Sequence, residues 1–157
     1  MGQGYNVTIE VQVENQGWEP KTTSIAFHVN TTVLAAYTNL ALTGRNQIIL
    51  NATWQTATDT KGNYAARIAG DAVSGETDIT DNNCTWMIHV GVPGDVSSSI
   101  QGVYDGIVNM RDIQYMILLF NAKPGSTNWN PNADVNNDLV VNMRDINIAI
   151  MNFNKHE

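Results

Sequence analysis

The chain has 157 residues, of which 43% are hydrophobic, a size and composition that suit one or two small domains with cores of their own. Its formal net charge is −7 and its isoelectric point is about 4.7, so we expect no nucleic acid as a partner, whereas cations are favoured. No apolar run approaches the roughly 18 residues of a membrane span, so no membrane-spanning segment is predicted, and the lone Cys84 excludes an internal disulfide.

Residues 1–92 show the two-residue alternation of half-buried β-strands. The alternation is clearest in 5–14, 24–30 and 48–56, and further strands are expected near 32–42, 64–70 and 86–92. Turn-forming segments such as TGRN and DTKGN separate these strands. Many short strands at this spacing predict an antiparallel β-sandwich. Trp54 lies on the inward register of its strand and is predicted to be a core residue, with ligand stacking as the alternative.

The same region resembles an Ig-like family, the CARDB or cell-adhesion-related domain of bacteria and archaea. The resemblance rests on VTIEVQVENQG, KGNYAARIAGDAV and GETDITDNN, and it covers about residues 2–92. It implies an Ig-like domain over residues 1–92 whose first strand would lie before Gln3. Because the sequence lacks that strand, either the chain is a fragment or another chain supplies the edge. An unpaired edge beside an apolar groove is then expected.

Four Asn-x-Thr sequons lie in this region, at Asn6, Asn30, Asn51 and Asn83. Threonine-rich strands produce some sequons by chance. However, Asn6, Asn30 and Asn51 all fall on the outward register of their segments. This agreement favours an exported, glycosylated surface.

The C-terminal part contains DVNNDLVVNMRD, residues 134–145, in which oxygen-bearing side chains recur at loop spacing. Single Asn and Asp residues favour turns, but the spacing here matches a 12-residue calcium loop with ligands at positions 1, 3, 5, 7, 9 and 12. Position 7 contributes its backbone carbonyl. The predicted metal ligands are Asp134, Asn136, Asp138, Val140, Asn142 and Asp145.

A second copy lies 33 residues upstream, where DGIVNMRDIQYMILLFNA from Asp105 aligns without gaps with DLVVNMRDINIAIMNFNK from Asp138. Each loop leads directly into apolar residues at helical spacing, so each unit is predicted to be a loop followed by a helix. Because one such helix cannot bury its stripe alone, the two should pack face to face and antiparallel. The stripes are Ile113, Met116, Ile117 and Phe120, and Ile146, Ala149, Ile150 and Phe153.

The paired units, the repeated VNMRDI and the intervening NWNPNADVNND resemble a type I dockerin domain of the kind found in archaeal surface proteins, with residues 94–157 covered. In that family each unit is half an EF-hand. The resemblance implies a small helical domain over residues 93–157 that binds two calcium ions. Leu139 stands where such a loop normally has Gly at a positive φ, a substitution that costs about 1–3 kcal/mol.

Loop one is longer than loop two, because Asp105 follows Asp95 by ten residues whereas Asp138 follows Asp134 by four. We interpret Asp95 as the first ligand, and a carbonyl in the insertion is the alternative to the third, Ser97. The ligand set expected for loop one is Asp95, Ser97, Asp105, Ile107, Asn109 and Asp112.

Partner contacts in the dockerin family come largely from loop positions 10 and 11. The corresponding residues here are Met110, Arg111, Met143 and Arg144. Identical pairs in both copies imply a two-fold symmetric binding face for a cohesin-like partner or a neighbouring copy.

No catalytic motif is recognisable in the sequence, so an enzyme is not expected. The leading hypothesis is a non-catalytic, calcium-binding structural or adhesion module of an extracellular or cell-surface protein. One alternative is a cohesin-type recognition module attached to a larger secreted protein. A second alternative is a subunit of an extracellular filament that a neighbour's strand completes.

Overall fold

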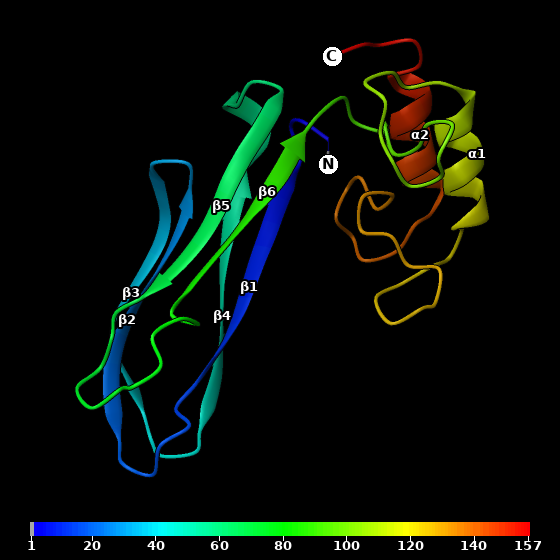
Figure 1. Cartoon of the computed structure of the whole chain (residues 1–157). Coiled ribbons are helices and arrows are strands. Elements are labelled where there is room, and N and C mark those ends of the chain that lie inside the picture. The colour runs from blue at the N-terminus through cyan, green and yellow to red at the C-terminus, as the bar shows by residue number, and fades with distance from the viewer. Residues whose placement is uncertain (1) are drawn as a thin grey trace. The chain divides into compact units, whose positions relative to one another are not determined.

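The computed structural model describes residues 2–157 (Figure 1). A short 3-10 helix, η1, covers Thr56–Thr58. The strands are β1 (Asn6–Glu14), β2 (Lys21–Val29), β3 (Thr32–Leu42), β4 (Gln47–Gln55), β5 (Gly62–Gly70) and β6 (Asn83–Val90), and the α-helices are α1 (Met110–Leu118) and α2 (Met143–Met151). Each predicted strand and each predicted loop-helix unit is therefore present within a few residues of its expected place.

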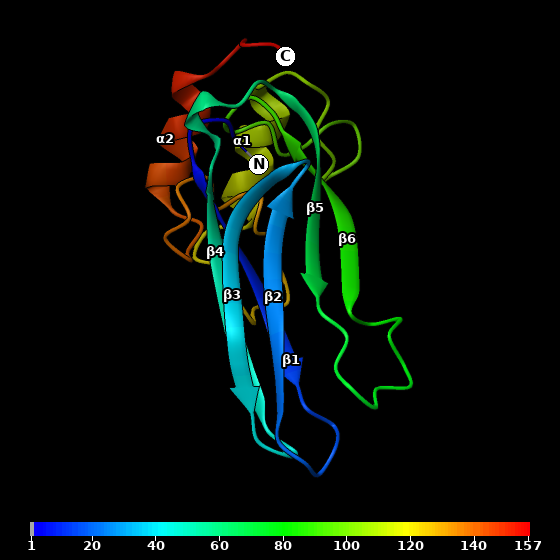
Figure 2. The same ribbon diagram turned by 90° about the vertical axis from the view of Figure 1, so that its left-hand side faces the viewer.

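The strands form two sheets. β1 pairs with β4, and β3, β2, β5 and β6 lie in that order in a four-stranded sheet (Figure 2). β2 runs antiparallel to β3 on one side and to β5 on the other, with Ala26 opposite Ala36 and Ala69 respectively. The predicted antiparallel β-sandwich is thus confirmed.

Most of the sandwich forms one compact unit, made of Thr8–Trp54 and Tyr64–Ile88. Its core follows the predicted alternation and includes Ile25, Phe27 and Val29 of β2 and Leu50, Ala52 and Trp54 of β4. Trp54 is only 4% exposed, and its ring meets the Tyr64 ring edge-on at 5.0 Å between centroids. The prediction that Trp54 is a core residue is correct.

The other compact unit contains 2–7, Gln55–Asn63 and His89–Glu157. Tyr5 packs against the core of this unit, so the N-terminal segment and the helical repeats share one apolar cluster. That core is Val92, Val96, Val108, Met116, Leu119, Ala122, Ala133, Val135, Val141, Ile146 and Ala149. The domain division at residues 92 and 93 stays a prediction.

The two repeats are joined reciprocally within this unit. The segment after α1 reaches the end of loop two, because the Asn121 N–H donates to the Val141 carbonyl at 2.8 Å. The segment after α2 reaches the end of loop one in the same way, because the Asn154 N–H donates to the Val108 carbonyl at 2.8 Å. Each repeat therefore closes the loop of the other.

The predicted apolar stripes of the helices are only partly buried, although α1 and α2 do contact each other. Met116 and Ala149 are fully buried and Ile146 is nearly so. Four other members of the stripes are exposed, namely Ile117 (55%), Phe120 (45%), Ile150 (50%) and Phe153 (41%). Loop residues such as Val108 and Val141 fill the core instead, so the helices need to bury only one narrow side.

Candidate calcium-binding loops

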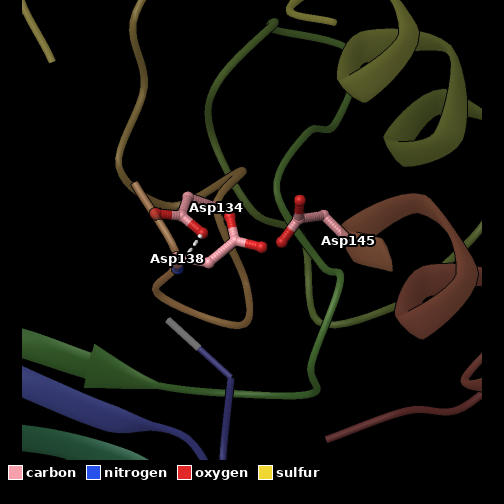
Figure 3. Close-up of side chains that lie close together, drawn as sticks. All are labelled: Asp134, Asp138 and Asp145. Carbon is pink, nitrogen blue, oxygen red and sulfur yellow. Dashed lines mark hydrogen bonds between the residues drawn. The ribbon is translucent and has the colours of Figure 1, made fainter. Parts of the chain in front are cut away.

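Loop two brings three carboxylates together. One oxygen from each of Asp134, Asp138 and Asp145 lies within 4.8 Å of the others. Asp134 and Asp138 project from the loop and Asp145 from the start of α2, and their carboxylates turn toward a shared space (Figure 3). The sequence placed these residues at loop positions 1, 5 and 12, and the fold makes them neighbours.

The last carboxylate of each loop is fully buried and organises the backbone around it. Asp145 Oδ1 accepts from the Asn136 N–H at 3.2 Å, and its Oδ2 accepts from the Asn142 N–H at 2.8 Å. Asp112 repeats this arrangement, with Oδ1 accepting from Ser97 N–H at 2.8 Å and Oδ2 from Asn109 N–H at 2.7 Å. Both loops are therefore closed around a carboxylate in the same way.

The first carboxylate of each loop also has matching partners. Asp134 accepts from the N–H groups of Asp138 and Leu139 at 3.0 and 2.8 Å. In loop one, Asp95 accepts from the N–H of Asp105 at 3.2 Å and from that of the next residue at 2.7 Å. The geometry thus makes Asp95 the counterpart of Asp134 despite the longer loop one.

The insertion in loop one makes its own turn. The Ser98 N–H and the Val103 N–H both donate to the Ile100 carbonyl, at 3.3 and 3.2 Å, and the Ile100 side chain is 66% exposed. Ser97, which precedes this turn, is 1% exposed. The extra residues therefore project outward, and loop one keeps the backbone hydrogen bonds to Asp95 and Asp112.

Asn109 and Asn142 have a role that the sequence interpretation missed. Each is the N-cap of its helix, and its side-chain oxygen accepts from the N–H two residues later, at 2.9 Å for Asn109 and 2.7 Å for Asn142. With Asp112 and Asp145 at the third helical position, each forms a reciprocal capping box. Asn-x-x-Asp before an apolar helical pattern was the available signal.

The electrostatics of the carboxylate groups favour a cation. Burial and, less strongly, the nearby Asp112 and Asp105 charges raise the pKa of Asp95 to about 6, although its backbone hydrogen bonds act to lower it. The pKa of Asp134 is raised for the same reasons, burial first and then Asp145 and Asp138. Burial also acts to raise the pKa of Asp138, but hydrogen bonds from Asn136 and Asn142 leave it lowered. Packing like charges together in this way is unfavourable unless a cation offsets them.

The donor set fits a hard cation. Carboxylates, amide oxygens and backbone carbonyls are the ligands that Ca²⁺ prefers, and the chain offers them at the spacing of a calcium loop. The Val140 carbonyl accepts a hydrogen bond from the side-chain amide of the helix-capping Asn142 at 3.1 Å. The Ile107 carbonyl accepts one from Asn109 in the same way at 3.3 Å. Within residues 2–157, the three-carboxylate grouping is found in loop two and not in loop one. The ligand assignments for both loops stay predictions.

Leu139 occupies the position at which a calcium loop normally needs glycine. Its φ is +65°, and its counterpart Gly106 in loop one has a φ of +86°. The Leu139 side chain is 58% exposed, so removing it uncovers no core. We expect Leu139→Gly to stabilise loop two by about 1 kcal/mol and to tighten calcium binding there, because the backbone strain disappears. Calorimetric titration measures this, and Gly106→Leu should have the opposite effect on loop one.

Both copies leave corresponding side chains on the surface. Met110 is 55% and Met143 52% exposed, and Arg111 and Arg144 are exposed beside them. The Arg144 guanidinium approaches the Asp138 carboxylate at 3.5 Å. Further along the helices the exposed apolar pairs are Ile117 and Ile150, Leu118 and Met151, and Phe120 and Phe153. The predicted partner-binding residues are therefore accessible, and their role stays a prediction.

The four sequon asparagines, Asn6, Asn30, Asn51 and Asn83, are also exposed. The Asn30 side-chain oxygen accepts from the Ala65 N–H at 2.9 Å, which leaves its amide nitrogen out of that bond. Glycosylation at these positions remains a prediction. Within residues 2–157, no helix is both long and apolar enough to cross a membrane.

The comparisons with known proteins give different matches for the two parts of the chain. Residues 103–154 match the model of the Dockerin type I domain family. No curated protein matches the chain.

Solved structures resemble the sandwich. The crystal structure of the CARDB domain of a Pyrococcus furiosus protein, in complex with di-metal ions, has a TM-score of 0.52 and 22% identity, covering 58% of this chain and 83% of that chain. The solution NMR structure of that Pyrococcus furiosus domain has a TM-score of 0.51 and 21% identity, covering 57% and 83%.

A cohesin–X-dockerin complex from Acetivibrio cellulolyticus also matches, with 16% identity over 85% of this chain and 83% of that chain. Its TM-score of 0.35 is too low to inform the structure of this chain. The CARDB and dockerin families consist of non-catalytic modules. The chain therefore combines a β-sandwich with the fold of a CARDB domain and a segment, residues 103–154, that matches the Dockerin type I domain family.

Proposed function

We propose that this chain is a calcium-stabilised protein-recognition module of an extracellular or cell-surface protein. The observation that carries the proposal is the repetition itself. Two loop-helix copies keep the same carboxylate hydrogen bonds and leave the same kinds of side chain exposed at equivalent positions. The repeated hydrogen bonds of the buried carboxylates are needed to hold the fold. The repeated exposed side chains contribute little to the core, so their repetition points to binding.

Calcium is the cofactor that we propose for both loops, with one ion in each. Loop two supports this most directly, because Asp134, Asp138 and Asp145 already share one space. Loop one supports it through the matched contacts of Asp95 and Asp112. Calcium would offset the carboxylate repulsion and hold each loop against the start of its helix.

The proposed partner is a cohesin-like domain that contacts one or the other copy. Met110 and Arg111 begin α1 as Met143 and Arg144 begin α2, so the two copies present similar apolar and basic groups. Exposed apolar side chains next to Arg are typical of interface centres. Because the two copies present equivalent side chains, we expect that a partner could bind either copy and so dock in two orientations.

The test is calorimetric titration of the full chain with purified type I and type II cohesin domains, in calcium and in chelator. Met110→Glu and Met143→Glu are suitable variants, since a carboxylate in the first helical turn favours the helix while it removes the apolar contact. Each single variant should weaken binding modestly, and the double variant should weaken it by about 100-fold or more. The control is Met87→Glu on β6, where the methionine is 62% exposed.

Two results would contradict the recognition role. One is the absence of binding to every cohesin tested with calcium-loaded, folded protein. The other is equal loss of binding in Met87→Glu. Either result would leave the purely structural or adhesion role, in which calcium stabilises a spacer domain and no cohesin is involved.

The extracellular placement rests on the exposed sequons and on the extracellular or surface proteins in which dockerin and CARDB domains typically occur. Mass spectrometry of the protein from its native host tests it, since glycans at Asn6, Asn30, Asn51 or Asn83 require export. Unmodified sequons in secreted protein would remove the glycosylation part alone. Recovery of the protein exclusively from the cytoplasm would contradict the placement itself.

A further inference from the structure

A groove of about 570 Å³ runs along the sandwich unit between the second half of β1 and the segment from Gly70 to Cys84. Its lining comes entirely from the unit made of Thr8–Trp54 and Tyr64–Ile88. None of its lining residues belongs to the calcium loops. The apolar residues that line it are Val11, Val13, Ile25, Leu42, Ile68 and Val73.

The strand edge at this groove is unpaired. β1 belongs to a two-stranded sheet with β4, and β6 is the outermost strand of the other sheet, so neither has a second neighbour among the strands that the structure describes. Val11 and Val13 point inward but stay half-exposed, whereas Leu50 and Ala52 on neighbouring β4 are buried. The inner face of β1 thus lacks the cover that the inner face of β4 has.

The rim of the groove is strongly acidic. Its carboxylates are Glu14, Asp71, Glu76, Asp78 and Asp81, and its one cationic side chain is Lys21. Lys21 is engaged locally, since its Nζ donates to the Ser74 carbonyl at 2.8 Å. The rim therefore has a net negative charge beside an apolar floor.

We propose that this groove binds an extended strand of another protein in which apolar residues alternate with Lys or Arg. The strand would pair with the free edge of β1 through backbone hydrogen bonds, as in other cases of strand addition. Alternate side chains of a strand point to opposite faces, so one set would enter the floor beside Val11 and Val13. The other set would meet the carboxylates of the rim.

Charge decides between the possible donors of the strand. A second copy of this chain carries 15 acidic and 8 basic residues, so it would bring net negative charge to a negative rim. A foreign basic strand gains electrostatically at the same place. The proposed occupant is accordingly a different protein, and association of copies into a filament is the competing outcome of the test.

Cys84 provides a reporter without any substitution. It is the only cysteine of the chain, it is exposed, and it lines the groove. The probes are two capped peptides of about seven residues, one alternating Val with Lys and the other Val with Glu. The measurements are the rate at which iodoacetamide alkylates Cys84 in the full chain and the dissociation constant from fluorescence anisotropy of labelled peptide.

The lysine peptide should protect Cys84 and bind at least about tenfold more tightly than the glutamate peptide. Glu14→Lys with Asp81→Lys should abolish or reverse this preference, since both residues are exposed and line the rim. Glu10→Lys with Glu19→Lys is the matched control, with the same change in charge at exposed residues outside the lining. A second control moves the cysteine to the outward face of β4 (Cys84→Ser with Thr53→Cys), where neither peptide should give protection.

Three results would overturn the proposal. One is equal binding of both peptides, and another is the same loss of preference in the control pair. The third is concentration-dependent association of the chain with itself that protects Cys84 while neither peptide binds, which would make a second copy the occupant. None of these results bears on calcium or cohesin binding.

Discussion

Chelating calcium should lower the melting temperature of the helical repeats by roughly 20 °C or more, because the carboxylates then repel one another in a small unit. A ligand at 100 times its dissociation constant adds about 2.7 kcal/mol to the folded state, so two ions would add about 5 kcal/mol. Circular dichroism at 222 nm follows α1 and α2 during heating. Adding calcium back should restore the transition, and magnesium at the same concentration should restore less of it.

Single substitutions distinguish the proposed calcium site of loop one from that of loop two. Asp112→Asn and Asp145→Asn remove one charge each but keep a side chain of the same size, so each should reduce the calcium stoichiometry from two to one. Because each repeat closes the loop of the other through the Asn121 and Asn154 hydrogen bonds, the remaining site should also bind more weakly. Asp71→Asn, at an exposed position on the sandwich, is the control. Unchanged stoichiometry and identical melting curves with calcium and with chelator would contradict the calcium assignment.

Met116→Ala should cost about 2–5 kcal/mol of unfolding free energy, whereas Ile117→Ala should cost less than about 1 kcal/mol. The two residues are neighbours in α1, but Met116 is fully buried in the core of the repeats and Ile117 is 55% exposed. Chemical denaturation in saturating calcium measures both. The comparison separates the side of the helix that holds the fold from the side that is free for a partner.

A large loss of stability in Ile117→Ala would mean that this side chain is covered in solution. The exposed apolar pairs would then be part of the fold and not a surface for recognition. A small loss in Met116→Ala would instead show that the loops hold the unit together without its core. The expected pattern, large at Met116 and small at Ile117, leaves Ile117 and Ile150 available for binding.

The strands of the sandwich could be predicted closely because each has one inward face. The alternation of the sequence predicted that Val7, Ile9, Val11 and Val13 face inward. In β1 these four residues are less exposed than their neighbours. Alternation does not say what covers a face, however. Ile9 is buried while Val11 and Val13 are half-exposed, although all three share one register of β1. The sequence predicted an apolar groove, whereas four of its five rim carboxylates come from the segment between β5 and β6, which the fold brings to the same place.

The same distinction holds for the repeats. By itself the sequence determined the 33-residue offset, the positions of the oxygen-bearing side chains and the need for a positive φ at Leu139, because these are properties of local chain geometry. Tertiary structure decided which apolar residues are buried, since Met116 and Ile117 lie in one predicted stripe yet differ completely in exposure. It also decided that three carboxylates meet in loop two and not in loop one. Local periodicity fixes the direction of a side chain, whereas its neighbours depend on segments distant in the chain.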